Sequence, residues 1–294
     1  MPTALRRLLD QRAQPLAPRL RGALLVTAGL GVAIATIWAW RSSDLVLDDI
    51  EWLPIAIAFV VAAPASLVLK ALEFRVAAGV AGQSPSGRRS LDVAVISSAA
   101  NLLPLPGSLL VTVRSLSEDG TTYGKAISAS AVPGLAWLAI TGLVGGAAIG
   151  IEGGPWLGAI VVVAGVAAGA GATALFRSTA PQEGRAALAA GIVLVEAGWL
   201  AVSALRLGLA VSALGVSIEP TQAVALSVAG ALTVAIGFFP GGLGVREALI
   251  AGLAPIIGLP FDTGVLLGSL DRVVWLAFLA LAAVVLSSRR SRVS

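Results

Sequence analysis

Residues 238–247 read Phe-Phe-Pro-Gly-Gly-Leu-Gly-Val-Arg-Glu, and this stretch separates two apolar runs of the chain. The runs on either side, 224–239 and 248–260, contain no charged residue. A helix cannot continue smoothly through Pro240-Gly241-Gly242, because proline lacks an amide donor and glycine favours open backbone. A charged side chain at the centre of a membrane costs about 2.5–3.5 kcal/mol on insertion scales. A broken helix that carries Arg246 and Glu247 in such surroundings predicts a functional site; the alternative is a turn outside the membrane with both side chains in water.

The composition indicates a membrane protein. The chain is 57% hydrophobic and 12% charged, with a mean hydropathy of +0.93. Several uncharged runs approach the ~20 residues that a spanning helix needs. The runs are long and rich in Ala, Leu and Gly, whereas membrane barrels show short alternating segments. We therefore expect an all-α polytopic membrane protein whose single transmembrane domain fills residues 1–294.

Several kinds of chemistry are excluded by residues that the chain lacks. It contains no cysteine and no histidine, which excludes disulfides, thiol nucleophiles, histidine metal ligands and Ser-His catalytic pairs. The net charge of +4 and the pI near 10.6 could suggest a nucleic-acid partner. The arginines instead flank apolar runs, as membrane topology demands, so we expect no nucleic-acid partner. We also expect no cofactor.

The charges also predict an orientation. Five arginines and one acid precede the first apolar run, 22–40, and Arg289, Arg290 and Arg292 end the chain. The positive-inside rule then places both termini in the cytoplasm of a multi-pass protein of the cell membrane, with an uncleaved signal anchor at the N-terminus. The expected full spans are 22–40, 52–72, 126–150, 156–176, 186–214 and 263–287.

Two segments are interrupted. The flanking loops have expected sides of the membrane, and these require segment 91–113 to enter and leave from the cytoplasm. They likewise require segment 221–260 to begin and end outside. The first is too short for two crossings at about 1.5 Å per residue, which favours a re-entrant hairpin. The second has a short arm, 245–257, although two full helices remain an alternative. The chain therefore has about six full spans plus two broken re-entrant hairpins, or about eight spans.

The order of these elements suggests an inverted repeat. Residues 22–150 and 156–287 each read as span, span, broken segment and span. Three crossings in each half give the two halves opposite orientation in the membrane. Secondary transporters show this pattern, with discontinuous helices at corresponding positions. Glycine spacings at Gly146/Gly150, Gly165/Gly169 and Gly264/Gly268 predict close helix packing.

The broken segments carry a family resemblance. The stretch 239–248, from the phenylalanine before Pro240 to the alanine after Glu247, resembles the signature of the lysylphosphatidylglycerol synthase/flippase transmembrane family. The run 213–216, Ala-Leu-Gly-Val, is similar to one that often precedes this signature. Ser108 stands where the family often has an acidic residue, and the spacing from Asn101 to Pro104 is shorter than usual. The resemblance covers about residues 60–287, and its other matching positions, in order, are Asn101, Pro104, Gly107, Arg114 and Arg272.

This resemblance implies the membrane module of the family without its soluble aminoacyl-transferase domain. Characterised members translocate aminoacylated phospholipids across the bilayer. The implied partners are membrane phospholipids, with a homo-oligomer or a separately encoded synthase as further options.

The candidate ligand-binding residues lie in the broken segments and the last span. Arginine suits phosphate because its planar fork bonds two oxygens, and the N-terminus of a half-helix adds partial positive charge. The candidates are Arg246, Glu247, Arg272, Arg114, Asn101, Gly241 and Gly242.

Each candidate also has a structural alternative. Arg246 and Glu247 could pair with each other, and Arg272 could pair with Glu196, since Asp271 lies on a different face of the helix. Arg114 could be a cytoplasmic anchor. We expect Asn101 to satisfy broken-helix backbone rather than bind a ligand, and Arg206 to extend toward the membrane surface.

We therefore expect a lipid flippase-like translocator rather than an enzyme. One alternative is a membrane-embedded transferase that acts on a lipid or polyprenyl phosphate. Such enzymes carry clustered acids for a divalent metal, whereas here only Asp48-Asp49 and Glu118-Asp119 are adjacent. A non-catalytic membrane subunit is a further alternative.

Overall fold

The chain is an all-α membrane protein. A computed structural model describes residues 33–34, 36–41, 50–101, 107–236 and 244–290, which form helices and turns and contain no strand. Five helices of this described part are long and apolar enough to cross a membrane, as the composition predicts: Trp52–Ala81, Tyr123–Ile151, Pro155–Thr179, Arg185–Ala213 and Phe261–Val285. The predicted first span, 22–40, lies largely outside the described residues.

The first of these five helices is longer than predicted. It consists of α3 (Trp52–Ile57), the π-helical turn η2 (Ala58–Ala62) and α4 (Ala63–Ala81). The predicted span 52–72 ended where charged residues begin, but Lys70 and Glu73 pair with each other across one helical turn and stay inside the helix. The helix ends instead at Gly82, whose positive φ of 82° suits only glycine.

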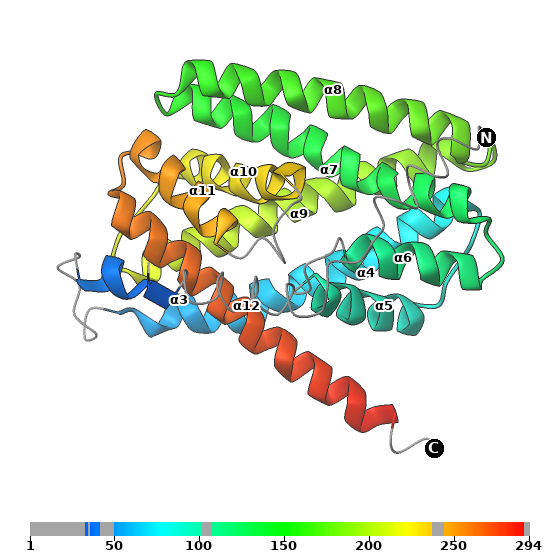
Figure 1. Cartoon of the computed structure of the whole chain (residues 1–294), viewed down its shortest axis with the longest axis horizontal. Helices are drawn as coiled ribbons and strands as arrows, with labels where there is room; N and C mark the ends of the chain where they lie inside the picture. The colour runs from blue at the N-terminus through cyan, green and yellow to red at the C-terminus, as the bar shows by residue number, and fades with distance from the viewer. Residues whose placement is uncertain (1–32, 35, 42–49, 102–106, 237–243, 291–294) are drawn as a thin grey trace.

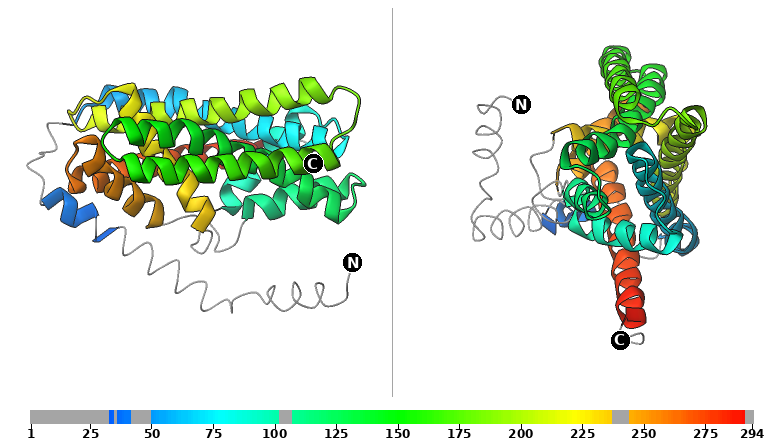
Figure 2. Two further views of the ribbon diagram at one scale, coloured as in Figure 1. Left: turned by 90° about the horizontal axis from the view of Figure 1, so that it is seen from above. Right: turned by 90° about the vertical axis from the view of Figure 1, so that its right-hand side faces the viewer.

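The other long helices agree with the predicted spans to within a few residues. They are α7 (Tyr123–Ile151), α8 (Pro155–Thr179), α9 (Arg185–Ala213) and α12 (Phe261–Arg290). Helices α7 and α8 lie side by side along one edge of the bundle, and the last turns of α12 extend beyond the other helices (Figures 1 and 2).

Both interrupted segments consist of short helices. The first contains α5 (Gly87–Ala100) and α6 (Gly107–Glu118), of 14 and 12 residues. The second contains α10 (Pro220–Ile236), α11 (Val245–Leu253) and the 3-10 turn η4 (Ala254–Ile257). At about 1.5 Å per residue, α5, α6 and α11 are each shorter than the ~30 Å hydrocarbon core.

Each interrupted segment begins and ends at the same end of the bundle. Gln83, just before α5, donates from Nε2 to the carbonyl oxygens of Leu116 and Asp119, at 3.0 and 3.2 Å, where α6 ends. Gln222, in the first turn of α10, donates to the carbonyl oxygen of Ile257 at 3.0 Å, where η4 ends. The two segments lie at opposite ends of the molecule (Figure 1).

Glycines set the closest helix contacts, as their spacing predicts. A Cβ on Gly146 of α7 would lie 2.9 Å from the carbonyl oxygen of Gly158 of α8. A Cβ on Gly264 of α12 would lie 2.7 Å from the Cα of Ala251, and one on Gly268 would lie 3.3 Å from the Cα of Glu247. The absence of side chains at Gly264 and Gly268 therefore lets α12 approach the backbone of α11.

We expect Gly264→Ala to destabilise the protein, because its Cβ would meet backbone that can move only if α11 moves. Overpacking of this kind costs about 1–3 kcal/mol. Gly252→Ala on α11 is the matched control, since nothing lies within 4 Å of its Cβ and alanine favours helix. The measurement is the thermal unfolding midpoint in detergent, and equal midpoints for the two variants would contradict the close contact.

The shared ends of the broken segments predict a labelling pattern. The chain has no cysteine, so single cysteines at Ser84, Thr122 and Ser217 report each position without background. We expect Ser84→Cys and Thr122→Cys to react with an impermeant thiol reagent from one side of the membrane and Ser217→Cys from the other. Labelling of Ser84→Cys and Thr122→Cys from opposite sides would contradict the hairpin.

Candidate functional site

Five charged side chains meet inside the bundle. Arg206 lies on α9, Arg246 and Glu247 lie in the first turn of α11, and Asp271 and Arg272 lie near the middle of α12. Glu247 is 4% exposed and Asp271 3% exposed. We call these five residues the arginine cluster.

Asp271 holds two arginines from two different helices. Its Oδ1 accepts from Nε of Arg206 at 2.9 Å and lies 2.8 Å from Nη2 of the same guanidinium. Its Oδ2 accepts from Nη1 of Arg246 at 2.6 Å. Because each carboxylate oxygen contacts a different arginine, this one side chain joins α9 and α11 to α12.

Glu247 makes a second link and also stabilises the start of α11. Its Oε1 accepts from Nε of Arg272 at 2.5 Å, and its Oε2 accepts from the backbone N–H of Gly244 at 2.9 Å. Gly244 has a φ of 81°, so it supplies the left-handed residue from which the helix begins. The sequence Gly-Val-Arg-Glu therefore starts α11 and places Arg246 and Glu247 against α12.

The cluster has an excess of positive charge. It contains three guanidinium groups and two carboxylates, a net formal charge of +1; each guanidinium contacts a carboxylate, and Arg206 and Arg246 share Asp271. The guanidinium of Arg206 also lies 5.1 Å from the ring centroid of Trp275. A net charge in an apolar interior is costly unless it is compensated.

A small cavity adjoins the cluster. Arg206 and Asp271 line it together with Ile55 and with Ala58, the first residue of the π-helical turn η2. Turns of π-helix occur frequently at functional sites.

The structure brings together three of the predicted site residues: Arg246, Glu247 and Arg272. Arg246 and Glu247 each form an ion pair with α12 rather than with each other. The predicted alternative of an Arg272–Glu196 pair is wrong, because Glu247 is the acid that contacts Arg272.

The sequence did not predict that Arg206 and Asp271 belong to the cluster. Arg206 does not extend to the membrane surface, because it is 9% exposed and bound to Asp271. Asp271 was set apart from Arg272 because adjacent residues differ by about 100° around a helix. Both nevertheless reach α11, since Arg246 and Arg272 have long side chains. One feature of the sequence could have identified Arg206 and Asp271 as site residues: each lies in a nearly uncharged run.

The remaining candidates lie elsewhere. Arg114 is mostly exposed on α6 and pairs with Glu118 at 2.9 Å, outside the arginine cluster. Asn101 accepts the backbone N–H of Ser108 at its Oδ1, at 2.9 Å, so the predicted role in satisfying broken-helix backbone is confirmed. Gly241 and Gly242 lie outside the described residues.

Comparison of the chain with models of known protein families finds no match, and comparison with curated proteins finds no significant match.

We expect Asp271→Asn to destabilise the protein strongly, because it removes the counter-charge of Arg206 and Arg246. Breaking a buried pair by removing one partner costs about 3–5 kcal/mol. Glu118→Gln is the matched control, since it breaks an exposed pair and should change stability little. The measurement is thermal unfolding in detergent, and equal midpoints would show that Asp271 is not needed to hold the two arginines.

Proposed function

We propose that this chain is a membrane carrier that translocates an amphipathic phospholipid, and that the arginine cluster binds the phosphate of its headgroup. The observation that supports this proposal is the buried excess positive charge of the cluster. A lipid phosphate would balance that charge while the acyl chains remain in the bilayer.

Arg246 is the first contact for the phosphate. Its side chain is 22% exposed, whereas those of Arg206 and Arg272 are 10% and 11% exposed. It also lies in the first turn of α11, where backbone N–H groups lack intrahelical acceptors and suit an anion. An arriving phosphate therefore competes with Asp271 for the guanidinium of Arg246.

The second part of the proposal is an inverted repeat with two re-entrant hairpins. It is supported by the short helices α5, α6 and α11 and by the glutamine contacts that return each broken segment to its own end. Repeats of opposite orientation around a central site allow alternating access. We place both termini in the cytoplasm on the basis of the flanking arginines.

The resemblance to the lysylphosphatidylglycerol synthase/flippase transmembrane family supports the same class of substrate. Of the residues that carry it, Arg246, Glu247 and Arg272 lie in the cluster. We therefore extend the proposal to aminoacylated phospholipids as candidate cargo in the cell membrane.

We expect Arg246→Ala to weaken lipid transport. Loss of one charged hydrogen bond costs about 1.5–3 kcal/mol, which is roughly 10- to 150-fold in affinity. Arg246→Lys should lose much of the same activity, because lysine lacks the bidentate fork. The measurement is translocation of fluorescent anionic and aminoacylated phospholipids by purified protein in liposomes.

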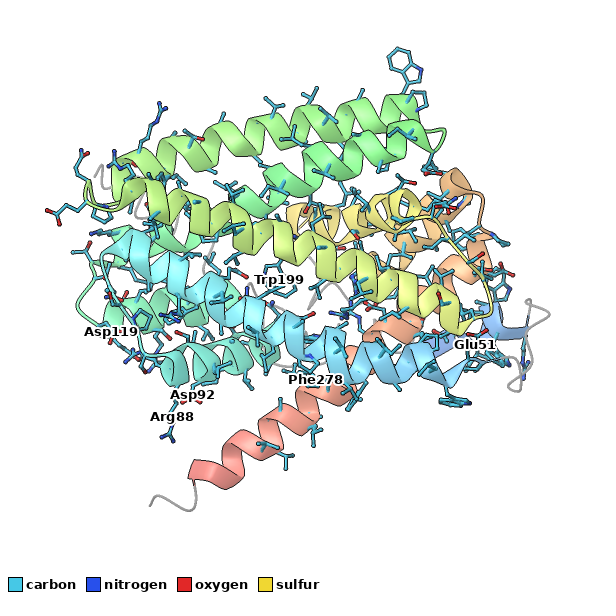
Figure 3. All side chains as sticks on the ribbon, turned by 180° about the vertical axis from the view of Figure 1, so that it is seen from behind. Glu51, Arg88, Asp92, Asp119, Trp199 and Phe278 are labelled. Atoms are coloured by element: carbon cyan, nitrogen blue, oxygen red, sulfur yellow. The ribbon has the colours of Figure 1, made fainter. Side chains whose placement is uncertain are left out.

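Arg88→Ala is the control, because Arg88 is exposed on α5 and points away from the molecule (Figure 3). Thermal melting checks that each variant is folded. Unchanged transport in a folded Arg246→Ala protein would leave the arginine cluster structural, and chemical conversion of the lipid would favour the transferase alternative.

A further inference from the structure

A second charged group lies inside the membrane-spanning part, away from the arginine cluster. Glu196 is 1% exposed on α9 and is the only charged residue between Arg185 and Arg206. At 1.5 Å per residue it lies about 15 Å from either arginine along the helix. Neither arginine is therefore its ion-pair partner.

Close packing of α4 and α9 sets the surroundings of Glu196. A Cβ on Gly198 would lie 3.0 Å from Leu69, and one on Gly79 would lie 2.8 Å from Leu188. These antiparallel contacts bring Lys70 and Glu73 of α4 level with Glu196.

The charges around Glu196 do not balance. Nζ of Lys70 lies 2.8 Å from each carboxylate oxygen of Glu73, so the lysine already has its counter-ion. Arg75, the other cation of α4, is exposed, and among the residues that the structure describes the other helices packed against α9 add no cation at this level. Helices α3, η2 and α10 carry no charge, Lys125 of α7 lies near Gly82 at the end of the bundle, and Asp271 and Arg272 of α12 belong to the arginine cluster.

Two polar atoms on this part of α9 lack hydrogen-bond partners. They are Oε1 of Glu196 and Nε1 of Trp199, one helical turn further on, and both atoms are buried. Trp199 lies near the middle of the molecule, between α9 and α4 (Figure 3). An ionised carboxylate with a buried oxygen that lacks a partner is far more costly than a neutral carboxylic acid.

We propose that Glu196 is a proton-binding site inside the membrane and that proton binding there is coupled to movement of the lipid. The coupling rests on the proposed function, whereas the proton site does not. Glu196 takes a proton from hydronium, which leaves water, and it returns the proton to water when it ionises. The Lys70–Glu73 pair, with side chains 17% and 22% exposed, is the charged group level with this carboxyl on α4, and we include it in the proposed proton path.

Helix α9 provides the physical connection between the two sites. It carries Glu196 and also Arg206, whose guanidinium binds Asp271 in the arginine cluster. A change in charge at Glu196 alters the contact between α9 and α4, and any displacement of α9 changes where Arg206 holds Asp271. Buried ionisable groups in transporters commonly serve as proton relays.

The proton site is tested by infrared spectroscopy of the purified chain in lipid nanodiscs. We expect a protonated-carboxyl stretching band at neutral pH that is lost in Glu196→Gln. Glu183→Gln, which changes an exposed acid, is the matched control and should keep the band. Absence of the band from the unmodified protein, or its persistence in Glu196→Gln, would overturn the proton site.

The coupling is tested with the same proteins in liposomes under an imposed pH difference of about one unit. Coupling of one proton to each lipid would allow up to about tenfold accumulation of fluorescent phospholipid, since one unit is a tenfold proton gradient. Glu196→Gln should equilibrate lipid without accumulation. If the unmodified protein transports lipid but does not respond to the gradient, only the coupling is overturned. If it transports no lipid and the infrared band is intact, the lipid carrier and its coupling are overturned while the proton site stands.

Discussion

The carboxylate of Asp271 is the constraint on which the interior of this protein depends. One acid binds two arginines that come from helices far apart in the sequence, Arg206 on α9 and Arg246 on α11. The contact with Arg206 is buried and the contact with Arg246 is partly buried, so removal of the shared acid would leave charge in the interior without its partner. The position of α12 is therefore fixed relative to two other helices by a side chain near its middle.

Several local features follow from this requirement. Helix α11 has to begin next to α12 if Arg246 is to reach Asp271, and Gly244 with Glu247 starts the helix at that point. The two helices also have to approach closely, which Gly264 and Gly268 permit. The broken segment, the helix start and the glycine contacts thus all serve one set of ion pairs, and the same set carries the excess charge that suits an anion.

Hydropathy was enough to predict the long helices, and Pro240-Gly241-Gly242 was enough to predict separate helices on either side. Helical boundaries were less predictable where charges are satisfied inside a helix, as Lys70 and Glu73 are in α4. The partners in the cluster could not be predicted, because the pairs join residues 65 and 25 positions apart and depend on which helices are neighbours. Helical periodicity predicts which face of a helix a residue occupies, but not how far an arginine side chain extends. Asp271 and Arg206 were therefore not predicted to contact the other members of the cluster.

Helix α9 contributes to two buried centres whose net charges would be opposite with Glu196 ionised, positive in the arginine cluster and negative around Glu196. They could in principle neutralise each other. At about 15 Å and an effective dielectric constant near 20, however, their attraction is only about 1 kcal/mol. That is small beside the several kcal/mol that burying each unpaired ion costs. Under the two proposals, a phosphate at the arginine cluster and a proton at Glu196 would each compensate the charge locally, and the state that holds both would have the least uncompensated charge in the membrane.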